Sequence, residues 1–295
     1  MSETKYKYNK YNNPLAKIRS KYIVINIFEH LRNDKLLDLI RYNKKYQKLM
    51  NKKLIDYKKE FSKIEIELIP KENKYGKFIN ISNKSFRSNI HIYFNDNKDE
   101  IKKETITKDD NVTKIKIIMN YKIKSLAKLF LDCDCIEKIN FIKFYKDDIK
   151  SMNSMFHNCS SLKELNLNKF NTNKVTDMSD MFNDCSSLKQ INFSNFNTNN
   201  ITDMSWMFSG CTSLEELNIR NFYYNDKTNM YGMFYRCSKL KKLNISNNSA
   251  NFKSMLKGCS TLKELNIYNS NDNNILNAHD IFEGCSSINA INVCN

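Results

Sequence analysis

The sequence predicts an α/β repeat solenoid in which each unit contributes one short helix and one short parallel strand. The first observation is a cysteine period: seven of the nine cysteines are separated by 26, 26, 26, 26, 22 and 26 residues. Such regularity is typical of stacked units that each pack only against their neighbours. We therefore predict seven units within residues 112–295. The phased residues are Cys133, Cys159, Cys185, Cys211, Cys237, Cys259 and Cys285.

The second observation predicts the helix. Met178, Met181, Phe182 and Cys185 fall at i, i+3, i+4 and i+7, the spacing of one helical face. A side chain that can accept a hydrogen bond from free N–H groups of a first helical turn precedes this stripe in every unit. We therefore expect each unit to open with a capped helix. The expected caps are Ser125, Ser151, Asp177, Asp203, Asn229, Asn251 and Asn277.

The third observation predicts the strand. Leu188, Ile191 and Phe193 follow the pattern apolar-x-x-apolar-x-apolar, which is typical of the strand of a leucine-rich repeat. Residues 112–117 show the same pattern ahead of the first unit, so we count eight strands and seven helices. The predicted fold is therefore an α/β leucine-rich-repeat solenoid with a small helical and β N-terminal region.

The motifs MSxMFxxCSSLKELNLxxFNT and VTDMSDMF resemble the BspA-type leucine-rich repeats of microbial surface and intracellular proteins. This resemblance covers most of the chain after residue 112. It implies a protein-binding solenoid, often one involved in adhesion or host contact, and it implies no catalytic residues.

Polar residues between the apolar strand positions are expected to line the concave face of such a solenoid. Asparagine fills the middle strand position of all seven units, where amides can bond along their own column or contact a partner. Arg220 and Tyr268 are the expected anchors because Arg and Tyr are enriched at interface hot spots, and Trp206 ranks second. The predicted partner-binding residues are Glu164, Asn166, Asn168, Gln190, Asn192, Glu216, Asn218, Arg220, Lys242, Asn244, Glu264, Asn266 and Tyr268.

The first sixty residues have a different composition. Residues 1–19 are predicted to be a disordered basic arm, and residues 20–60 have apolar positions at helical spacing. The latter segment, YIVINIFEHLRNDKLLDLIRYNKKYQKL, resembles an F-box, which implies docking onto a cullin-ligase adaptor. The alternative is a helical cap over the solenoid. The adaptor-binding residues implied by the resemblance are Ile27, Phe28, Leu31, Leu36 and Leu37.

Residues 61–111 are predicted to be a β-rich capping region with a charged loop. Ile64, Ile66 and Leu68 alternate with charged residues, as do the apolar residues at 90–94 with polar ones, which favours half-buried strands. The ends of a solenoid need such a cap with a polar outer face.

No cofactor, metal site or enzymatic activity is expected. The sequence contains no C-x-x-C pair, and the phased cysteines share their stripe with Met and Phe, so we expect buried, reduced thiols. No P-loop, nucleophile elbow, zinc-protease or dinucleotide-binding motif occurs.

The chain carries a net charge of +16 and contains no apolar run long enough to span a membrane. A positive charge attracts nucleic acid, but no aromatic RNA-binding signature accompanies it, so nucleic acid is a disfavoured partner. We expect a cytoplasmic interaction scaffold for a protein partner, with a cullin-ligase adaptor as a further candidate if residues 20–60 are an F-box. The alternative is a surface or secreted adhesion or effector protein. Residues 285–295 are further expected to self-associate weakly through an open sheet edge.

Overall fold

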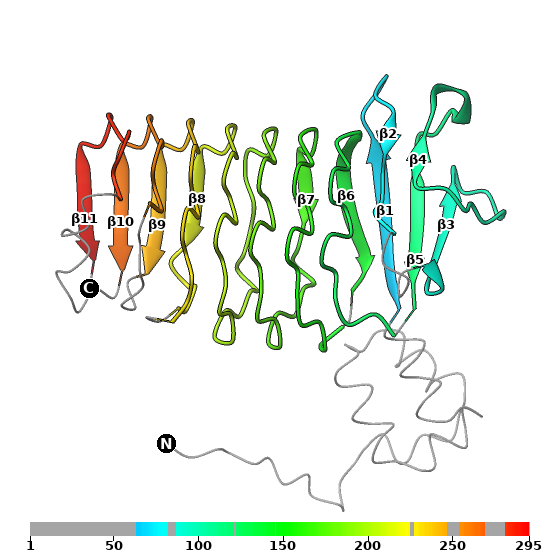
Figure 1. Ribbon diagram of the computed structural model, residues 1–295, viewed down its shortest axis with the longest axis horizontal. Coiled ribbons are helices and arrows are strands. Elements are labelled where there is room, and N and C mark those ends of the chain that lie inside the picture. The colour runs from blue at the N-terminus through cyan, green and yellow to red at the C-terminus, as the bar shows by residue number, and fades with distance from the viewer. Residues whose placement is uncertain are drawn as a thin grey trace, which may run out of the picture. The chain divides into compact units, whose positions relative to one another are not determined.

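The computed structural model describes residues 63–81, 87–120, 122–144, 146–224, 227–246, 254–268 and 281–294. All of them belong to one compact unit, Ser62–Asn295. Within this unit the chain forms a β-solenoid whose successive coils stack along one axis (Figure 1). The predicted basic arm at 1–19 and the F-box-like segment at 20–60 lie outside the described residues.

Strands occupy one wall of the solenoid, which we call the strand wall. Two sheets contribute to it, in the orders β3-β5-β1-β6-β7 and β11-β10-β9-β8. From β6 onward the paired strands are parallel and in register, so the asparagine of one strand faces the asparagine of the next. The solenoid strands are β6 (Ile136–Lys143), β7 (Glu164–Asn166), β8 (Glu216–Ile219), β9 (Lys242–Ser246), β10 (Glu264–Tyr268) and β11 (Ala290–Cys294).

The N-terminal end of the solenoid carries an antiparallel extension. There, β1 (Ile64–Pro70) pairs with the first solenoid strand β6 on one side and with β5 (Ile115–Met119) on the other. The prediction that residues 112–117 supply the first parallel strand is therefore wrong, because β5 runs antiparallel between β1 and β3 (Ile90–Phe94). The sequence pattern indicates only which side chains are buried. The same alternation occurs in parallel and in antiparallel strands, so it could not predict the direction of this strand.

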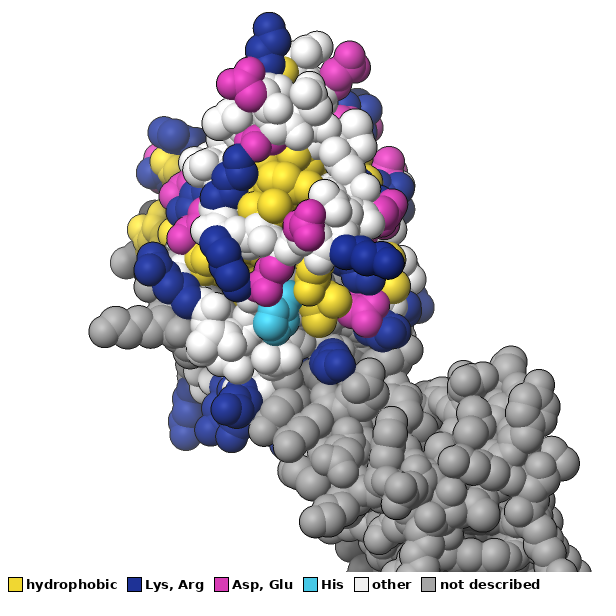
Figure 2. Space-filling view, turned by 90° about the vertical axis from the view of Figure 1, so that its right-hand side faces the viewer, with side chains coloured by type: hydrophobic (Ala, Val, Ile, Leu, Met, Phe, Trp, Pro, Cys, Tyr) yellow, Lys and Arg dark blue, Asp and Glu magenta, His cyan; other side chains and the backbone are white. Residues whose placement is uncertain are grey.

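The outer strand β3 is itself partly covered. Ile101 bridges Ile92 and donates its backbone N–H to the Ile92 carbonyl at 2.8 Å. Figure 2 looks onto this end, where Lys, Arg, Asp and Glu side chains surround a small hydrophobic area. Charged surroundings of this kind protect a sheet edge from pairing with other chains. The remaining short elements here are β2 (Gly76–Lys77), β4 (Thr105–Ile106) and the 3-10 helix η2 (Lys108–Asp110).

The predicted helices are not present: no described residue of any repeat lies in an α-helix. Residues 151–159 instead form two tandem turns, in which Met155 N–H bonds the Met152 carbonyl and Cys159 N–H bonds the Phe156 carbonyl, both at 3.1 Å. Further N–H groups bond across to the next coil, as Met152 does to the Asp177 carbonyl at 2.9 Å. We call this side the turn wall. It comprises residues 125–133, 151–159, 177–185, 203–211 and 229–237 and the described residues of 254–259 and 281–285.

Two tandem four-residue turns explain why the sequence suggested a helix. Each turn buries its first and last residue, so Met152, Met155, Phe156 and Cys159 point inward at i, i+3, i+4 and i+7. That spacing matches a helical stripe and gives no information about which backbone hydrogen bonds form. The third residue of each turn has a positive φ, as in a type II turn; examples are Ser154 at 51° and Asn158 at 58°.

Of the residues expected to cap helices, the five that the structure describes act in these turns, and Asn251 and Asn277 lie outside the described residues. The Asp177 carboxylate accepts the backbone N–H of Ser179 at 3.0 Å, and Asp203 accepts that of Ser205 at 2.8 Å. Both bonds span two residues and close a turn of the side-chain type that Asp, Asn and Ser favour. The sequence therefore correctly predicted that these side chains accept backbone N–H groups. It wrongly predicted that they do so at the start of a helix, because they do so in a turn.

The predicted buried stripe is confirmed, and it forms continuous columns through the solenoid. Five phenylalanine rings stack with centroid separations of 5.4 to 5.7 Å; they are Phe130, Phe156, Phe182, Phe208 and Phe234. Beside them runs a thiol column in which Cys185 donates to the Phe156 carbonyl one coil earlier at 3.1 Å. Cys159, Cys211, Cys237 and Cys259 repeat this bond at 3.0 to 3.2 Å. Each thiol therefore ties two coils together inside the core.

Burial also sets the protonation of these thiols. Desolvation raises the pKa of the Cys159 and Cys211 thiols, because the charged thiolate would lose its hydration. The less enclosed Cys135 thiol has its pKa raised to about 11 by the same cause. The solenoid therefore holds its phased thiols in the neutral form that can donate a hydrogen bond.

Candidate functional site

The residues predicted to contact a partner lie on the outside of the strand wall. We expected them on a concave face, but that face was a feature of the predicted helix-containing fold, which the structure does not have. Glu164, Gln190, Glu216, Asn218 and Arg220 are exposed. Asn166, Asn168 and Asn192 are also exposed, Lys242, Asn244, Glu264 and Tyr268 are half-buried, and Asn266 is buried.

Much of the charge on the strand wall is neutralised between coils. Lys138 pairs with Glu164 at 2.6 Å and Lys242 pairs with Glu264 at 2.9 Å, each bridging neighbouring strands. The hydrogen bond from Lys242 lowers the pKa of the Glu264 carboxyl. Exposed pairs of this kind add little to stability, and they leave little unpaired charge for a partner.

The asparagines at the middle strand positions make two different kinds of hydrogen bond. Towards β11 the amides bond along the axis, from Asn292 to Asn266 and from Asn266 to Asn244, both at 2.7 Å. Earlier in the solenoid, Asn166 and Asn192 instead accept backbone N–H groups two residues further along their own chain, at 3.0 and 2.8 Å. The column therefore supports the backbone in several coils, and partner contact by these amides stays a prediction.

The two expected anchors of the strand wall contact each other. The Arg220 guanidinium carbon lies 6.0 Å from the centroid of the Tyr268 ring, although the two residues are separated by the coil that carries Ser246. A guanidinium over an aromatic face is attracted by the electrons of the ring. These side chains thus form one feature of the strand wall.

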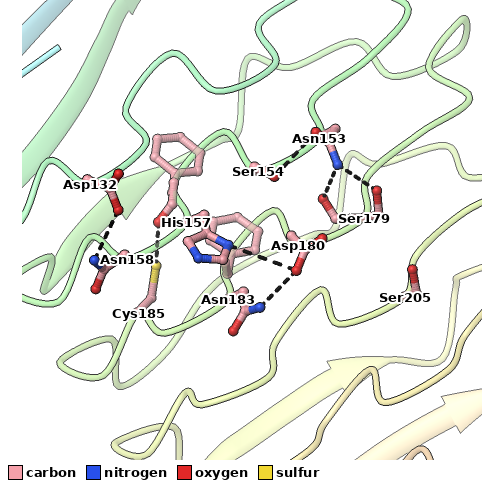
Figure 3. A network of polar contacts seen from close by, with 12 residues as sticks. Asp132, Asn153, Ser154, His157, Asn158, Ser179, Asp180, Asn183, Cys185 and Ser205 are labelled. Atoms are coloured by element: carbon pink, nitrogen blue, oxygen red, sulfur yellow. Dashed lines mark hydrogen bonds and ion pairs between the residues drawn. The ribbon is translucent and has the colours of Figure 1, made fainter. Parts of the chain in front are cut away.

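The turn wall presents mostly small polar side chains, which bond to one another across coils (Figure 3). Asn153 donates to the Ser179 hydroxyl in the next coil at 2.7 Å, and within that coil Asn183 donates to the Asp180 carboxylate at 2.8 Å. His157 lies 3.9 Å from the same carboxylate. Over these coils the turn wall is a polar surface satisfied by its own neighbours.

One part of the turn wall is different. Trp206 replaces the small polar residue of its column, and its ring centroid lies 5.1 Å from that of Tyr231 and 5.5 Å from that of Tyr235 in the next coil. Both tyrosines meet the indole edge-on, at 69° and 80°. Arg236 places its guanidinium carbon 5.0 Å from the Tyr235 ring centroid. We call these four residues the aromatic patch.

The aromatic patch is accessible and held by the backbone. Tyr231 is 41% exposed, Trp206 and Tyr235 are half-buried and Arg236 is exposed. Trp206 and Arg236 both sit at turn positions with positive φ, 58° and 59°, where side chains are rarely found. Placing Trp and Arg there costs backbone energy, which small polar residues or glycine at the same positions would reduce.

The sequence pointed to only part of this patch. Trp206 was singled out as lying off the buried stripe, whereas Tyr231, Tyr235 and Arg236 were not. A usable signal was present, because four of the five glycines lie at the third position of a turn: Gly232 in a first turn, and Gly210, Gly258 and Gly284 in second turns. Trp206 and Arg236 occupy the equivalent positions of their own first and second turns.

The far end of the described solenoid is β11. It pairs with β10 on one side, and within the described residues no strand pairs with its other edge. Ile291 and Val293 are 36% and 56% exposed, whereas the facing Leu265 and Ile267 of β10 are buried. The predicted self-association through residues 285–295 stays a prediction.

No group of three or more His, Cys, Asp or Glu side chains is placed to hold a metal ion within the ranges that the structure covers. Among the same residues, no helix has the length and apolar character needed to cross a bilayer.

Residues 124–248 match the sequence family described as Mycoplasma protein of unknown function, DUF285. The matched range is less than half of the chain. It begins beside Ser125, where the first turn-wall bridge forms, and it ends just after β9, so it follows the coils of the solenoid. It also contains the whole aromatic patch. No curated protein and no solved structure matches the chain.

Proposed function

We propose that this chain is a non-enzymatic protein-binding scaffold whose principal contact surface is the aromatic patch. A repeat solenoid presents varied side chains on a constant frame, which suits recognition of another macromolecule. The observation that carries the proposal is that Trp, Tyr and Arg meet at one accessible place. These are the residue types that dominate interface hot spots.

The two walls differ in how much of their exposed surface is already paired with neighbouring side chains. On the strand wall, charged and amide side chains pair mainly with one another between coils. On the turn wall, Tyr231 exposes a large aromatic surface next to Trp206, beyond a polar network. Burying aromatic surface supplies more binding free energy than replacing ion pairs that already exist. The aromatic patch is therefore the stronger candidate, and Arg220 with Tyr268 is the lesser one.

Photo-crosslinking from a single site tests the proposal. A photoreactive phenylalanine analogue would replace Tyr231, and a matched variant would carry it at Tyr223, which is 48% exposed outside the turn wall. We expect discrete protein adducts from position 231 in cells that express the full chain. The same adducts should be missing from position 223. Identical adduct patterns from both positions, or none from 231, would contradict the proposal.

The cytoplasmic placement is part of the same proposal. The solenoid uses its phased thiols as hydrogen-bond donors to backbone carbonyls, a role that requires the reduced form. The competing proposal, a surface or secreted protein of BspA-like type that binds host molecules, predicts a different location. Fractionation of the native cell distinguishes the two.

A receptor role in ubiquitin ligation is a second proposal, favoured by the apolar spacing of Ile27, Phe28 and Leu31 followed by Leu36 and Leu37. These residues lie outside the described part of the chain, so the proposal rests on the sequence resemblance alone. Replacing Ile27 and Phe28 with Asp should abolish capture of a cullin-ligase adaptor. Failure of the wild-type chain to capture any adaptor would remove this proposal and leave the solenoid's own binding role untouched.

A further inference from the structure

The aromatic patch lies beside a reversal of charge along the turn wall. Asp184, Gly210 and Arg236 occupy the same turn position in three successive coils, each with positive φ. Adjacent coils are separated by about 4.8 Å, so Asp184 and Arg236 are attached to the backbone about 10 Å apart. Gly210 between them has no side chain. The Asp184 carboxylate leans over it, since a Cβ at 210 would lie 2.1 Å from Asp184 Oδ1.

Arg236 is the available cation of this surface. Its guanidinium makes no ion pair with any described residue and contacts the Tyr235 ring. Lys257, in the next coil, is by contrast bonded to Glu283 at 2.8 Å, and that bond raises the pKa of Lys257. A guanidinium resting on an aromatic ring keeps its N–H edges free to bind a carboxylate in a bidentate geometry.

The apolar half of the surface adjoins this cation. Trp206 lies against both Tyr231 and Tyr235, so the ring under Arg236 and the indole belong to one continuous aromatic surface. Tyr231 makes no recorded hydrogen bond through its hydroxyl to the described residues, so this group is free to bond to a ligand. A ligand that fits both halves combines a carboxylate with an adjacent ring.

We infer that the aromatic patch binds an acidic, aromatic segment of a protein partner, with a carboxylate on Arg236 and a ring against Trp206 and Tyr231. This inference rests on the proposed binding function and specifies its ligand. An extended segment advances about 3.3 Å per residue, so the roughly 10 Å from Arg236 to Asp184 corresponds to about three residues. Backbone N–H groups or a basic side chain of the segment would then face Asp184.

The carboxylates favour a peptide over a nucleic acid. A single-stranded nucleic acid would also stack bases on aromatic rings, but it carries a phosphate at every nucleotide. Asp180 and Asp184 lie one coil before Trp206 and would repel that backbone. A peptide needs only one carboxylate, placed at Arg236, and can be neutral or basic where the aspartates lie.

The single tryptophan provides the measurement. Because the chain contains one Trp, emission excited beyond tyrosine absorption reports on the aromatic patch alone. The full chain would be titrated at low ionic strength with a Glu–Tyr peptide, which carries one Glu beside a Tyr and a Lys about three residues away, with a Lys–Tyr peptide, in which Lys replaces that Glu, and with oligouridylate. We expect saturable changes in Trp206 emission with the Glu–Tyr peptide. Its apparent affinity should fall about tenfold in Arg236→Gln, the loss of one charge-assisted contact.

Lys128→Gln is the matched control, because Lys128 is an exposed cation of the same turn wall, four coils before Arg236, and makes no ion pair with the described residues. It should bind like wild type, and both variants should show the wild-type circular dichroism. No response to the Glu–Tyr peptide, an unchanged affinity in Arg236→Gln, or tighter binding of either the Lys–Tyr peptide or oligouridylate would overturn the inference. Crosslinking from position 231 would still report separately on whether the surface binds protein at all.

Discussion

The indole of Trp206 occupies the space above Gly232 in the next coil. A Cβ at position 232 would lie 2.7 Å from both Cε3 and Cζ3 of the indole, closer than real side chains approach. Gly232 also has a φ of 61°, so the glycine serves both the turn and the tryptophan. The aromatic patch thus depends on a residue with no side chain.

Gly232→Ala should therefore displace the indole towards solvent. The added methyl group and the positive φ together should lower the free energy of unfolding by about 1–3 kcal/mol. We expect the Trp206 emission to shift to longer wavelength. Gly258→Ala is the matched control, because its φ is 82° but its Cβ would meet nothing nearer than 3.5 Å. It should cost stability without moving the emission, and equal spectra for the two variants would contradict this packing.

Cys211→Ala should remove an inter-coil hydrogen bond, since this thiol donates to the Phe182 carbonyl at 3.2 Å. Losing the donor and leaving a small cavity should lower the free energy of unfolding by about 1–3 kcal/mol, measured by urea denaturation. The comparison is Cys294→Ala in β11, where the thiol is half-buried. A change there should stay within about 0.5 kcal/mol. Similar effects at both positions would argue against the thiol column.

Stability should fall at alkaline pH. Burial raises the folded-state pKa of the Cys159, Cys185 and Cys211 thiols above the ordinary value, so the folded chain keeps protons that the unfolded chain releases. The stability from this effect is complete below about pH 9 and is lost as the pH rises towards the folded-state pKa. In Cys211→Ala the slope above pH 9 should be shallower by about 1.4 kcal/mol per pH unit, one proton. Parallel slopes for variant and wild type would count against buried, neutral thiols.

Arg220 and Tyr268 should show weak coupling in a double-mutant cycle. An exposed cation–aromatic contact contributes about 0.5–1 kcal/mol, and Arg220→Gln with Tyr268→Leu isolates that term. Urea denaturation of the two single variants and the double variant measures it. Strictly additive effects would mean that this contact contributes nothing to folding and that both side chains are free for a partner.

The sequence correctly predicted which side chains of the repeats are buried and wrongly predicted the backbone conformation that buries them. Met178, Met181, Phe182 and Cys185 were expected to be buried together, and they are. Their spacing fits a helix and a pair of turns equally well, so hydrophobic periodicity could not decide between the two. The deciding information lay at the outward positions, where Gly210 and Asp184 occupy a left-handed backbone conformation that a helix interior does not contain.

The candidate site was harder to predict for a related reason. Trp206 and Tyr235 come from different coils, and they meet because each lies on the outer side of a turn. If each unit began with a helix, as predicted, these two side chains would point in different directions around their helix axes and would not meet. By contrast, the strand positions of Arg220 and Tyr268 were placed on one surface correctly, because alternation along a strand is the same in both folds.

Each repeat begins with two tandem turns whose third residue has a positive φ, and Lys128→Gly tests this most directly. Lys128 has a φ of 61°, is exposed, and makes no ion pair or hydrogen bond through its side chain to the described residues. In a turn of this kind, glycine relieves backbone strain, so we predict a gain of about 0.5–1 kcal/mol in the free energy of unfolding. The neighbouring Ala127→Gly, at an ordinary φ, should instead lose stability. A loss of about 1 kcal/mol in Lys128→Gly, the cost of glycine inside a helix, would contradict the β-solenoid.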